Sequence, residues 1–337
     1  MVKKQVTVKD IAKRLRLHYT TVSKALRDHP DISPATKQRV ATLAEELNYH
    51  PNSIAKSLKR QATSTLGVIV PSIKNDFFSA VISGVEEVAY GREFNTVVCQ
   101  SNESTEREAI HLDTLISNRA AGVLVSVAQT TTSGTRFRAL QRQGIPLVFF
   151  DRVCPDVEAG KVVVDDFGGA LRAVRYLVES GYRRIAHAAE RGNTSVGRER
   201  CRGYISALEQ CGVAVDHDLI AYGGLEEKDG IAACRQFLAR DPKPDAIFAV
   251  NDPVALGVYK EIRQRGLEIP GDVALVGFGD NTLSSYLDPP LTTVKQSPYE
   301  IGKVATRMLL RQIEDPAHRM ASETEVIETE LIVRKST

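Results

Sequence analysis

The chain has 337 residues, of which 42% are hydrophobic and 26% are charged, and its formal net charge is +2. This length leaves room for two or three domains, and the composition is that of an ordinary globular protein, which excludes fibrous and disordered classes. No apolar run approaches the roughly 20 residues that span a bilayer, and no apolar segment follows the basic N-terminus as in a secretory signal, so we expect a cytoplasmic protein without a membrane partner.

The first predicted helix begins at Val8. Thr7 and Asp10 have the three-residue spacing of a capping box, in which each side chain satisfies a backbone N–H of the other. Apolar residues recur at helical spacing between positions 11 and 15, while the basic residues around them face elsewhere. The pattern predicts a short amphipathic helix.

A second helix is predicted over residues 19–26, after a turn at residues 16–18. Val22, Ala25 and Leu26 would pack inward, which leaves a polar face free to meet a partner. The outward side chains are Tyr19, Thr20, Thr21 and Lys24. Two short helices joined in this way describe a helix-turn-helix, and a third helix that opens at Ser33 would close a small core.

Residues 48–65 differ in character from the head before them. Pro51 ends the preceding helix, and Asn52 can cap a short helix that carries Leu58 on its apolar face. A helix this short is not stable alone in water, so it needs either a second copy of itself or DNA. The polar residues 61–65 then form a linker.

The small net charge conceals a basic head and an acidic body. Residues 1–60 contain 13 Lys and Arg against 5 Asp and Glu, a balance of +8. Subtraction from the chain totals of 44 and 42 leaves 31 basic and 37 acidic residues in 61–337, a balance of −6. Charge alone is equally typical of a solvated basic surface, but together with a helix-turn-helix it favours double-stranded DNA as the partner of the head.

Nine short apolar runs alternate with helical patterns after residue 65, and they are LGVIV, TVVC, GVLVSV, PLVFF, VVV, RIAHAA, LIAY, AIFAV and VALVGF. Such runs suit strands buried on both faces, and the segments between them are long enough for crossover helices. Nine are too many for one small sheet. We therefore predict an α/β core of two doubly wound parallel lobes, divided near Val162.

The five cysteines, Cys99, Cys154, Cys201, Cys211 and Cys234, lack the spacing of a disulfide framework or a zinc site. We expect reduced thiols, no metal and no cofactor.

Ligands of such sheets bind beyond the carboxyl ends of the strands, so the residues that follow the apolar runs are the informative ones. They are Pro71, Ser72, Gln100, Ser101, Ser126, Asp151, Arg152, Asp165, Tyr222, Asn251, Asp252 and Asp280. Most are polar, and two facing rims of this kind would form a cleft. Any single member is equally typical of an ordinary turn.

Residues 6–59 resemble the head of the lactose/galactose-repressor (LacI/GalR) family of bacterial transcription regulators. The resemblance continues through LGVIVPSIKNDFF, AGVLVSV, PLVFFDR, AVNDPVALG, VALVGFGD, PPLTTVKQ and ELIVRKST, so it covers essentially the whole chain. It implies a three-helix DNA-binding head at 1–50 and a hinge at 51–65, followed by a core similar to periplasmic sugar-binding proteins. The expected lobes of that core are 66–161 with 292–321, and 162–291 with 322–337.

By this resemblance, Tyr19, Thr20 and Lys24 stand where the family reads base edges in the major groove. The phosphate contacts that it implies are Thr7, Thr21, Ser23 and Asn52. Leu58 matches the residue that the family inserts from the minor groove to kink the duplex. The alternative for Leu58 is packing on a neighbouring helix.

The resemblance also implies a small effector between the lobes. The candidate contacts are Pro71, Asn75, Phe77, Ser126, Asp151, Arg200, Leu225, Asn251, Asp280 and Gln296. Arg200 is the strongest candidate, because a guanidinium can hold vicinal hydroxyls, a carboxylate or a phosphate with two parallel bonds. Its alternative is a surface ion pair.

Four positions depart from the family. Arg16 replaces the usual glycine of the inter-helix turn, and His18 replaces a serine. Gly279 stands where many members have an aspartate, with Asp280 after it, and Leu225 stands where the lactose and purine repressors have an aromatic ring. The identity of the effector is therefore open.

Two other functional classes fit the sequence less well. An α/β enzyme is disfavoured because the phosphate-binding glycine patterns and the G-x-S-x-G elbow are absent, and His187 lies in a strand-like run typical of a core histidine. An exported binding protein is disfavoured by the missing signal segment and the basic head. The sequence favours a dimeric repressor, alone or paired into a tetramer, that binds an operator under control of a carbohydrate-like effector.

Overall fold

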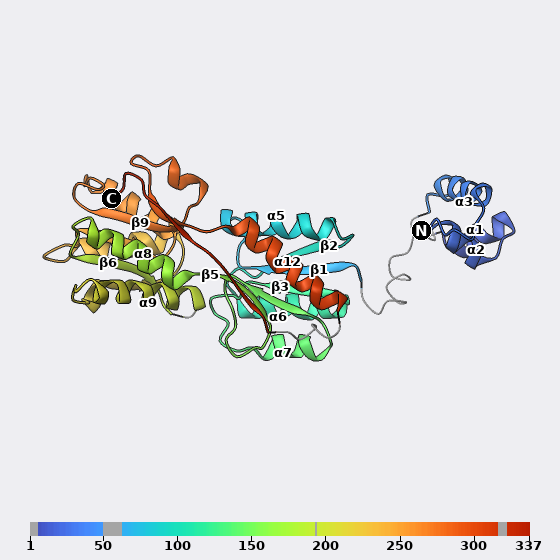
Figure 1. Ribbon diagram of the computed structural model, residues 1–337, viewed down its shortest axis with the longest axis horizontal. Coiled ribbons are helices and arrows are strands. Elements are labelled where there is room, and N and C mark those ends of the chain that lie inside the picture. Colours follow the sequence, from blue (N-terminus) through green and yellow to red (C-terminus); the bar gives the residue numbers. More distant parts are fainter. Residues whose placement is uncertain (1–5, 50–62, 193, 316–321) are drawn as a thin grey trace. The chain divides into compact units, whose positions relative to one another are not determined.

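The structure is a computed structural model that describes every residue except 1–5, 50–62, 193 and 316–321 (Figure 1). The chain divides into two compact units, Met1–Thr63 and Ser64–Thr337. Each unit has its own hydrophobic core and is described by itself. Asn52, Leu58 and the predicted hinge helix lie outside the described residues.

The first unit contains the three predicted helices, α1 (Val8–Leu15), α2 (Tyr19–Ala25) and α3 (Pro34–Glu46). The capping box is confirmed, since the Thr7 backbone N–H donates to Oδ2 of Asp10 at 2.8 Å and the Asp10 N–H donates to Oγ1 of Thr7 at 3.3 Å. Ile11, Val22 and Val40 are fully buried where the three helices meet. The helix-turn-helix therefore has a closed apolar core.

The turn between α1 and α2 forms without a glycine. Arg16 adopts the left-handed conformation, with φ 53° and ψ 41°. The N–H of Leu17 donates to the carbonyl of Ala12 at 3.0 Å, which closes the end of α1. A non-glycine residue in this region costs about 1–2 kcal/mol, so the head tolerates local strain to keep its turn.

The second unit is built on two six-stranded sheets. The first has the order β11-β5-β4-β3-β1-β2 and is parallel throughout. Its strands are β1 (Thr65–Val70), β2 (Asn95–Gln100), β3 (Gly122–Val125), β4 (Leu147–Phe150), β5 (Gly160–Val164) and β11 (Thr324–Ile327). The second has the order β12-β10-β9-β8-β6-β7, and only β12 is antiparallel to its neighbour. Its strands are β6 (Ile185–Glu190), β7 (Ile220–Gly223), β8 (Ala246–Ala249), β9 (Ala274–Gly279), β10 (Thr292–Lys295) and β12 (Glu330–Ile332).

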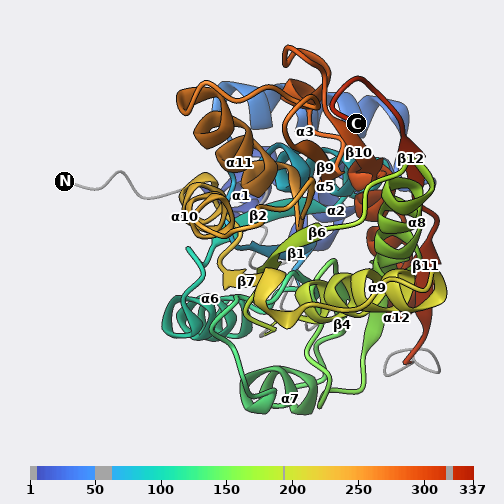
Figure 2. The ribbon, with the colours of Figure 1, turned by 90° about the vertical axis from the view of Figure 1, so that its left-hand side faces the viewer.

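Helices cover both faces of each sheet. In the first lobe these are α5 (Asp76–Tyr90) and α12 (Pro298–Glu314) on one face, with α6 (Thr105–Ser117) and α7 (Thr135–Arg142) on the other. In the second lobe α8 (Asp166–Glu179) and α9 (Ser195–Gln210) face α10 (Glu227–Leu238) and α11 (Asp252–Gln264) across the sheet (Figure 2). Two short 3-10 helices, η1 (His217–Leu219) and η2 (Thr282–Ser285), complete this lobe. The predicted pair of doubly wound lobes is confirmed.

All nine apolar runs form strands, but the chain crosses between the lobes at other places than expected. The division near Val162 falls inside β5, which pairs with β4 up to Val162 and with β11 up to Val164. Residues 292–295, expected in the first lobe, form β10 and pair with β9 of the second. Residues 324–327, expected in the second lobe, pair with β5 of the first. These short strands contain few apolar residues, so pairing, rather than pattern, determines their lobe.

The first lobe depends on a close approach of α5 and α12. A Cβ at Gly84 would lie 2.1 Å from the carbonyl oxygen of Tyr299, and a Cβ at Gly302 would lie 2.1 Å from that of Val81. Backbone cannot yield as the end of a side chain can, so the two glycines fix the distance between the helices.

We expect Gly84→Ala to lower the stability of the second unit by about 2 kcal/mol, because the added methyl forces α5 away from α12. Gly91→Ala is the matched control, since Gly91 ends the same helix with φ −62° and its nearest neighbour would be 3.5 Å away. Thermal unfolding of both variants checks this. Equal melting temperatures would contradict the role of the close approach.

Candidate functional site

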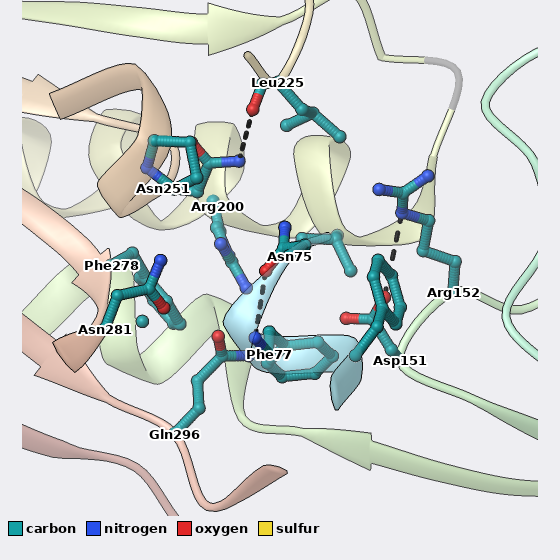
Figure 3. A pocket seen from close by; sticks show the side chains of 14 residues that line it. Asn75, Phe77, Asp151, Arg152, Arg200, Leu225, Asn251, Phe278, Asn281 and Gln296 are labelled. Atoms are coloured by element: carbon teal, nitrogen blue, oxygen red, sulfur yellow. Dashed lines mark hydrogen bonds and ion pairs between the residues drawn. The ribbon is translucent and has the colours of Figure 1, made fainter. Parts of the chain in front are cut away.

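A pocket lies between the two lobes of the second unit, at the carboxyl ends of their strands (Figure 3). It encloses about 430 Å³ of empty space, part of which is open to solvent. The lining residues are Asn75, Phe77, Phe78, Asp151, Arg152, Val196, Arg200, Leu225, Asn251, Pro253, Phe278, Gly279, Asn281 and Gln296.

Helix starts bring two of the amides to the pocket. Asn75 caps α5, where its Oδ1 accepts the N–H of Phe77 at 2.9 Å. Asn251 caps α11, where its Oδ1 accepts the N–H of Val254 at 2.8 Å and its Nδ2 donates to the carbonyl of Leu225 at 3.0 Å. Capping therefore fixes both side chains before any ligand arrives.

Arg200 lies at the centre of the second lobe's wall and is 3% exposed. Its Nε and Nη2 both lie 2.8 Å from Oδ1 of Asp166, and its Nη1 donates to the carbonyl of Val250 at 2.6 Å. The guanidinium also lies over the ring of Phe278, 3.6 Å from the centroid. Among the described residues these acceptors engage three of its five N–H groups, so two remain for a ligand.

The opposite wall carries Asp151, which follows β4 in the left-handed conformation with φ 59°. Its Oδ2 accepts from Oγ of Ser126 at 3.1 Å and lies 3.7 Å from Nε of Arg152. The Nη1 of Arg152 in turn donates to both carboxylate oxygens of Glu103, at 2.8 and 2.9 Å. Both pocket guanidiniums therefore already have carboxylate partners.

Burial weakens the acidity of the pocket carboxyls. It raises the pKa of Asp166 to about 6, although the neighbouring Arg200 acts in the opposite direction. It also raises the pKa of Asp151, against the opposing effect of Arg152. Two guanidiniums face the carboxyls of Asp151, Asp166 and Glu103, so the site has no surplus of positive charge to attract an anion.

One buried donor on the pocket wall has no partner among the described residues. The Nε2 of Gln296 is enclosed and makes no hydrogen bond to any described residue, and the side chain is 6% exposed. An unpaired buried amide costs roughly 1–3 kcal/mol, which a ligand acceptor would recover. Figure 3 shows Gln296 beside Phe77.

Seven of the ten predicted effector contacts lie on the pocket wall, and these are Asn75, Phe77, Asp151, Arg200, Leu225, Asn251 and Gln296. Ser126 lies behind Asp151 and bonds to it, and Pro71 is not on the wall. Asp280 was expected to line the cleft, but its Oδ1 accepts from Nη2 of Arg334 at 2.6 Å instead. The carboxylate of Asp280 is therefore engaged by Arg334 and does not line the pocket.

Asn281 reaches the pocket in place of Asp280, and the sequence alone did not single it out. Gly279 has φ +147°, and a Cβ there would lie 3.2 Å from Oδ1 of Asn281. The backbone N–H of Asn281 donates at 2.8 Å to Oδ2 of Asp252, a fully buried carboxylate that also accepts from Ser284. The glycine that departs from the family pattern is therefore the signal that could have found Asn281.

His187 is a core residue, as predicted. It is fully buried in β6, stacks on Phe248 and Tyr204, and its Nδ1 lies 3.0 Å from the carbonyl of Phe248. Burial lowers its pKa to about 4, so the ring is neutral at physiological pH.

The predicted base-reading face of α2 is accessible. Tyr19 is 51% exposed, and Thr20 and Lys24 are also exposed. The Nζ of Lys24 lies 2.9 Å from Oδ2 of Asp31. Of the predicted phosphate contacts, Thr7 has its hydroxyl engaged with Asp10 at 2.7 Å.

No helix of the described chain is long and apolar enough to cross a membrane. The described residues also contain no group of His, Cys, Asp and Glu side chains arranged to hold a metal ion.

Comparison with known proteins gives matches along the whole chain. Residues 7–52 match the family described as bacterial regulatory proteins, lacI family, and residues 174–337 match a periplasmic binding protein-like domain. The chain is 33% identical to the HTH-type transcriptional repressor CytR of Escherichia coli K12, over 98% of this chain and 96% of that one. It is 32% identical to the repressor PurR of Pasteurella multocida, over 98% of each. Its structure is similar to a complex of the transcriptional regulator CelR with cellobiose, with a TM-score of 0.75, 29% identity and coverage of 99% and 100%.

Breaking the buried pair should be costly. Asp166→Asn removes the charge that balances Arg200, so we expect a loss of about 3–5 kcal/mol, seen as a fall in melting temperature at pH 7. Adding Arg200→Met should recover most of it, because the uncompensated charge is gone. Additive losses in this double-mutant cycle would show that the pair is not coupled.

Proposed function

The chain belongs to the LacI family of bacterial regulatory proteins, and from that membership we propose that it represses transcription by binding a pseudo-palindromic operator as a homodimer. We propose further that a small, uncharged, hydroxyl-rich effector in the inter-lobe pocket controls its affinity for DNA. The sequence resemblance, the head and the pocket support this function together.

The effector proposal rests on one observation, that the two walls of the pocket come from different lobes. Asp151 and Asn75 come from the first lobe, and Arg200, Asn251 and Asn281 come from the second. A ligand that bonds to both walls favours one arrangement of the lobes over others, and so shifts the population of the protein. Effector binding and lobe arrangement are then thermodynamically linked.

The chemistry of the pocket supports a hydroxyl-rich ligand. Arg200 retains two N–H groups and Gln296 has an unpaired amide, while Asp151 and the amide oxygens can accept. Hydroxyls both donate and accept, so they match this mixture. An anion would gain little, because Asp166 and Glu103 already neutralise the two guanidiniums.

The outward face of α2 supports base readout in the major groove. Lysine can donate to guanine O6 and N7, and a threonine offers a hydroxyl and a methyl group. Residues Thr7, Thr21, Ser23 and Asn52 would contact phosphates, which position the head without reading sequence. Leu58 would open a base step from the minor groove.

Exposed apolar side chains on both lobes support a homodimer. Val97 and Val98 lie on β2, and Tyr222 lies on β7, which are the edge strands farthest from β11 and β12 in their sheets. Tyr286 is 80% exposed in the second lobe. A second copy covering these edges would protect unpaired strands and supply the two-fold symmetry that a palindromic site requires. The hinge at 52–60 would then be held as a pair, and the lobes would control it.

An enzymatic role has less support. The relatives are transcription repressors. Within the described chain, the pocket wall has no serine, cysteine or histidine, and its carboxylate, Asp151, is already paired with Ser126 and Arg152.

Lys24→Ala tests base readout. An operator is first selected from random DNA with the unaltered protein. We expect the variant to lose about 10-fold or more of its affinity for that operator and much less for random DNA, because one base contact is worth ~1–3 kcal/mol. Lys13→Ala, an exposed basic residue of α1, is the matched control and should weaken both alike. Equal losses for Lys24→Ala would rule out base readout.

Gln296→Leu separates binding from folding. Ribose, cellobiose, nucleosides and purines are first screened for an increase in the melting temperature of the unaltered protein. The variant should keep or exceed the stability of the ligand-free protein, because an unpaired buried amide is removed, yet lose most of the ligand-induced increase. A variant that still responds fully would place the effector elsewhere.

A further inference from the structure

Two hydrogen bonds join the lobes outside the pocket. Gln129, which follows β3 in the first lobe, donates from Nε2 to Oε1 of Glu190, the last residue of β6 in the second, at 2.8 Å. The N–H of Val153 in the first lobe donates to Oγ of Ser195, the first residue of α9, at 3.2 Å. None of these four residues lines the pocket.

The Gln129–Glu190 bond lies away from the segments near β11 and β12 that cross between the lobes. In the first sheet β5 and β4 separate β3 from β11, and in the second β10, β9 and β8 separate β6 from β12. A rotation of the lobes about the crossing segments therefore moves Gln129 and Glu190 apart by more than it moves residues near β11 and β12. The Gln129–Glu190 bond exists only while the lobes are together.

The two carboxylate oxygens of Glu190 serve different lobes. Oε2 accepts the N–H of Gly192 at 2.9 Å, and the N–H and Oγ1 of Thr194, both at 3.3 Å. Thr194 in turn caps α9, since its Oγ1 accepts the N–H of Gly197 at 3.0 Å. Oε1 is left for Gln129 of the other lobe. The side chain is fully buried, so loss of the Gln129 bond would leave a carboxylate oxygen to be rehydrated.

On the first-lobe side the chain of bonds continues to the pocket. The backbone N–H of Gln129 donates to Oε2 of Glu103 at 2.7 Å, and Glu103 accepts Nη1 of Arg152. Arg152 lies on one pocket wall, while α9 carries Arg200 on the other. A continuous set of hydrogen bonds thus joins the two walls around the outside of the site.

We propose that Gln129 and Glu190 form an inter-lobe latch, which holds the lobes closed without an effector and fixes the start of α9. The latch sets the geometry of Arg200 through α9 without touching a ligand, so Glu190 is a positioning residue. This inference rests on the proposed function only in treating the pocket as the effector site, and closure itself can be measured with no ligand present.

The test measures the distance between the lobes in the full-length, ligand-free protein. Spin labels on unnatural amino acids at Arg107 of α6 and Lys228 of α10, which are exposed and belong to different lobes, report it by double electron–electron resonance. We expect Gln129→Ala to raise the ratio of open to closed molecules about 10-fold or more, because a charge-assisted bond is lost. Gln143→Ala, at an exposed glutamine of the first lobe, is the matched control and should leave the distance distribution unchanged.

A reversal of the bond distinguishes the latch from a general loss of structure. Gln129→Glu should open the lobes further, because two carboxylates then face each other. Adding Glu190→Gln should restore closure, since the amide introduced at position 190 can donate to the carboxylate introduced at position 129, while its oxygen accepts from Thr194. An unaltered protein that is mainly open, a closed Gln129→Ala variant, or a double variant that stays open would each overturn the proposal. None of these outcomes depends on whether an effector binds.

Discussion

The arrangement of the second lobe around the pocket depends on one buried positive charge, the guanidinium of Arg200. A cation at 3% exposure is stable only if it is paired, and its partner Asp166 is the first residue of α8, directly after the chain has crossed from the first lobe. Its other partners are the carbonyl of Val250, directly after β8, and the ring of Phe278, the second-last residue of β9. One side chain thus ties the crossing point to two strand ends, so that the geometry of the pocket and the packing of the second lobe are set together.

The fold could be predicted from the sequence because strands that are buried on both faces have a recognisable sequence pattern. Strands covered by helices on two sides need continuous apolar runs, and each of the nine runs became a strand. The segments that cross between the lobes have no such pattern. The strand Thr292–Lys295 has a single valine, and its place beside β9 follows from hydrogen-bond pairing between residues distant in the chain. The periodicity of apolar residues does not show which distant strands pair, so the predicted lobe boundaries were wrong where the chain crosses between the lobes.

The same distinction holds within the pocket. That polar residues after buried strands would gather there follows from parallel topology, and seven of the ten candidates do line it. Which of two neighbouring residues faces inward depends on the partners that each finds in the folded chain. Asp151 and Asp280 both have a left-handed φ, yet Asp151 lies on the wall, whereas Asp280 pairs with Arg334 and Asn281 lines the pocket instead. Residue type does not reveal this difference.

Several features that oppose stability lie around this pocket. Asp166 keeps a carboxyl whose pKa burial has raised, Gln296 encloses an unpaired amide, and Asp151 holds a conformation unfavourable to a side chain. A core selected for stability alone would replace such groups with apolar ones. Arg16 is a similar case in the head, where a residue in a strained conformation forms the turn that leads into α2. At the pocket and at α2, a ligand or DNA could use the strain and the unmet hydrogen bond, which agrees with the proposal that the protein acts through these two surfaces.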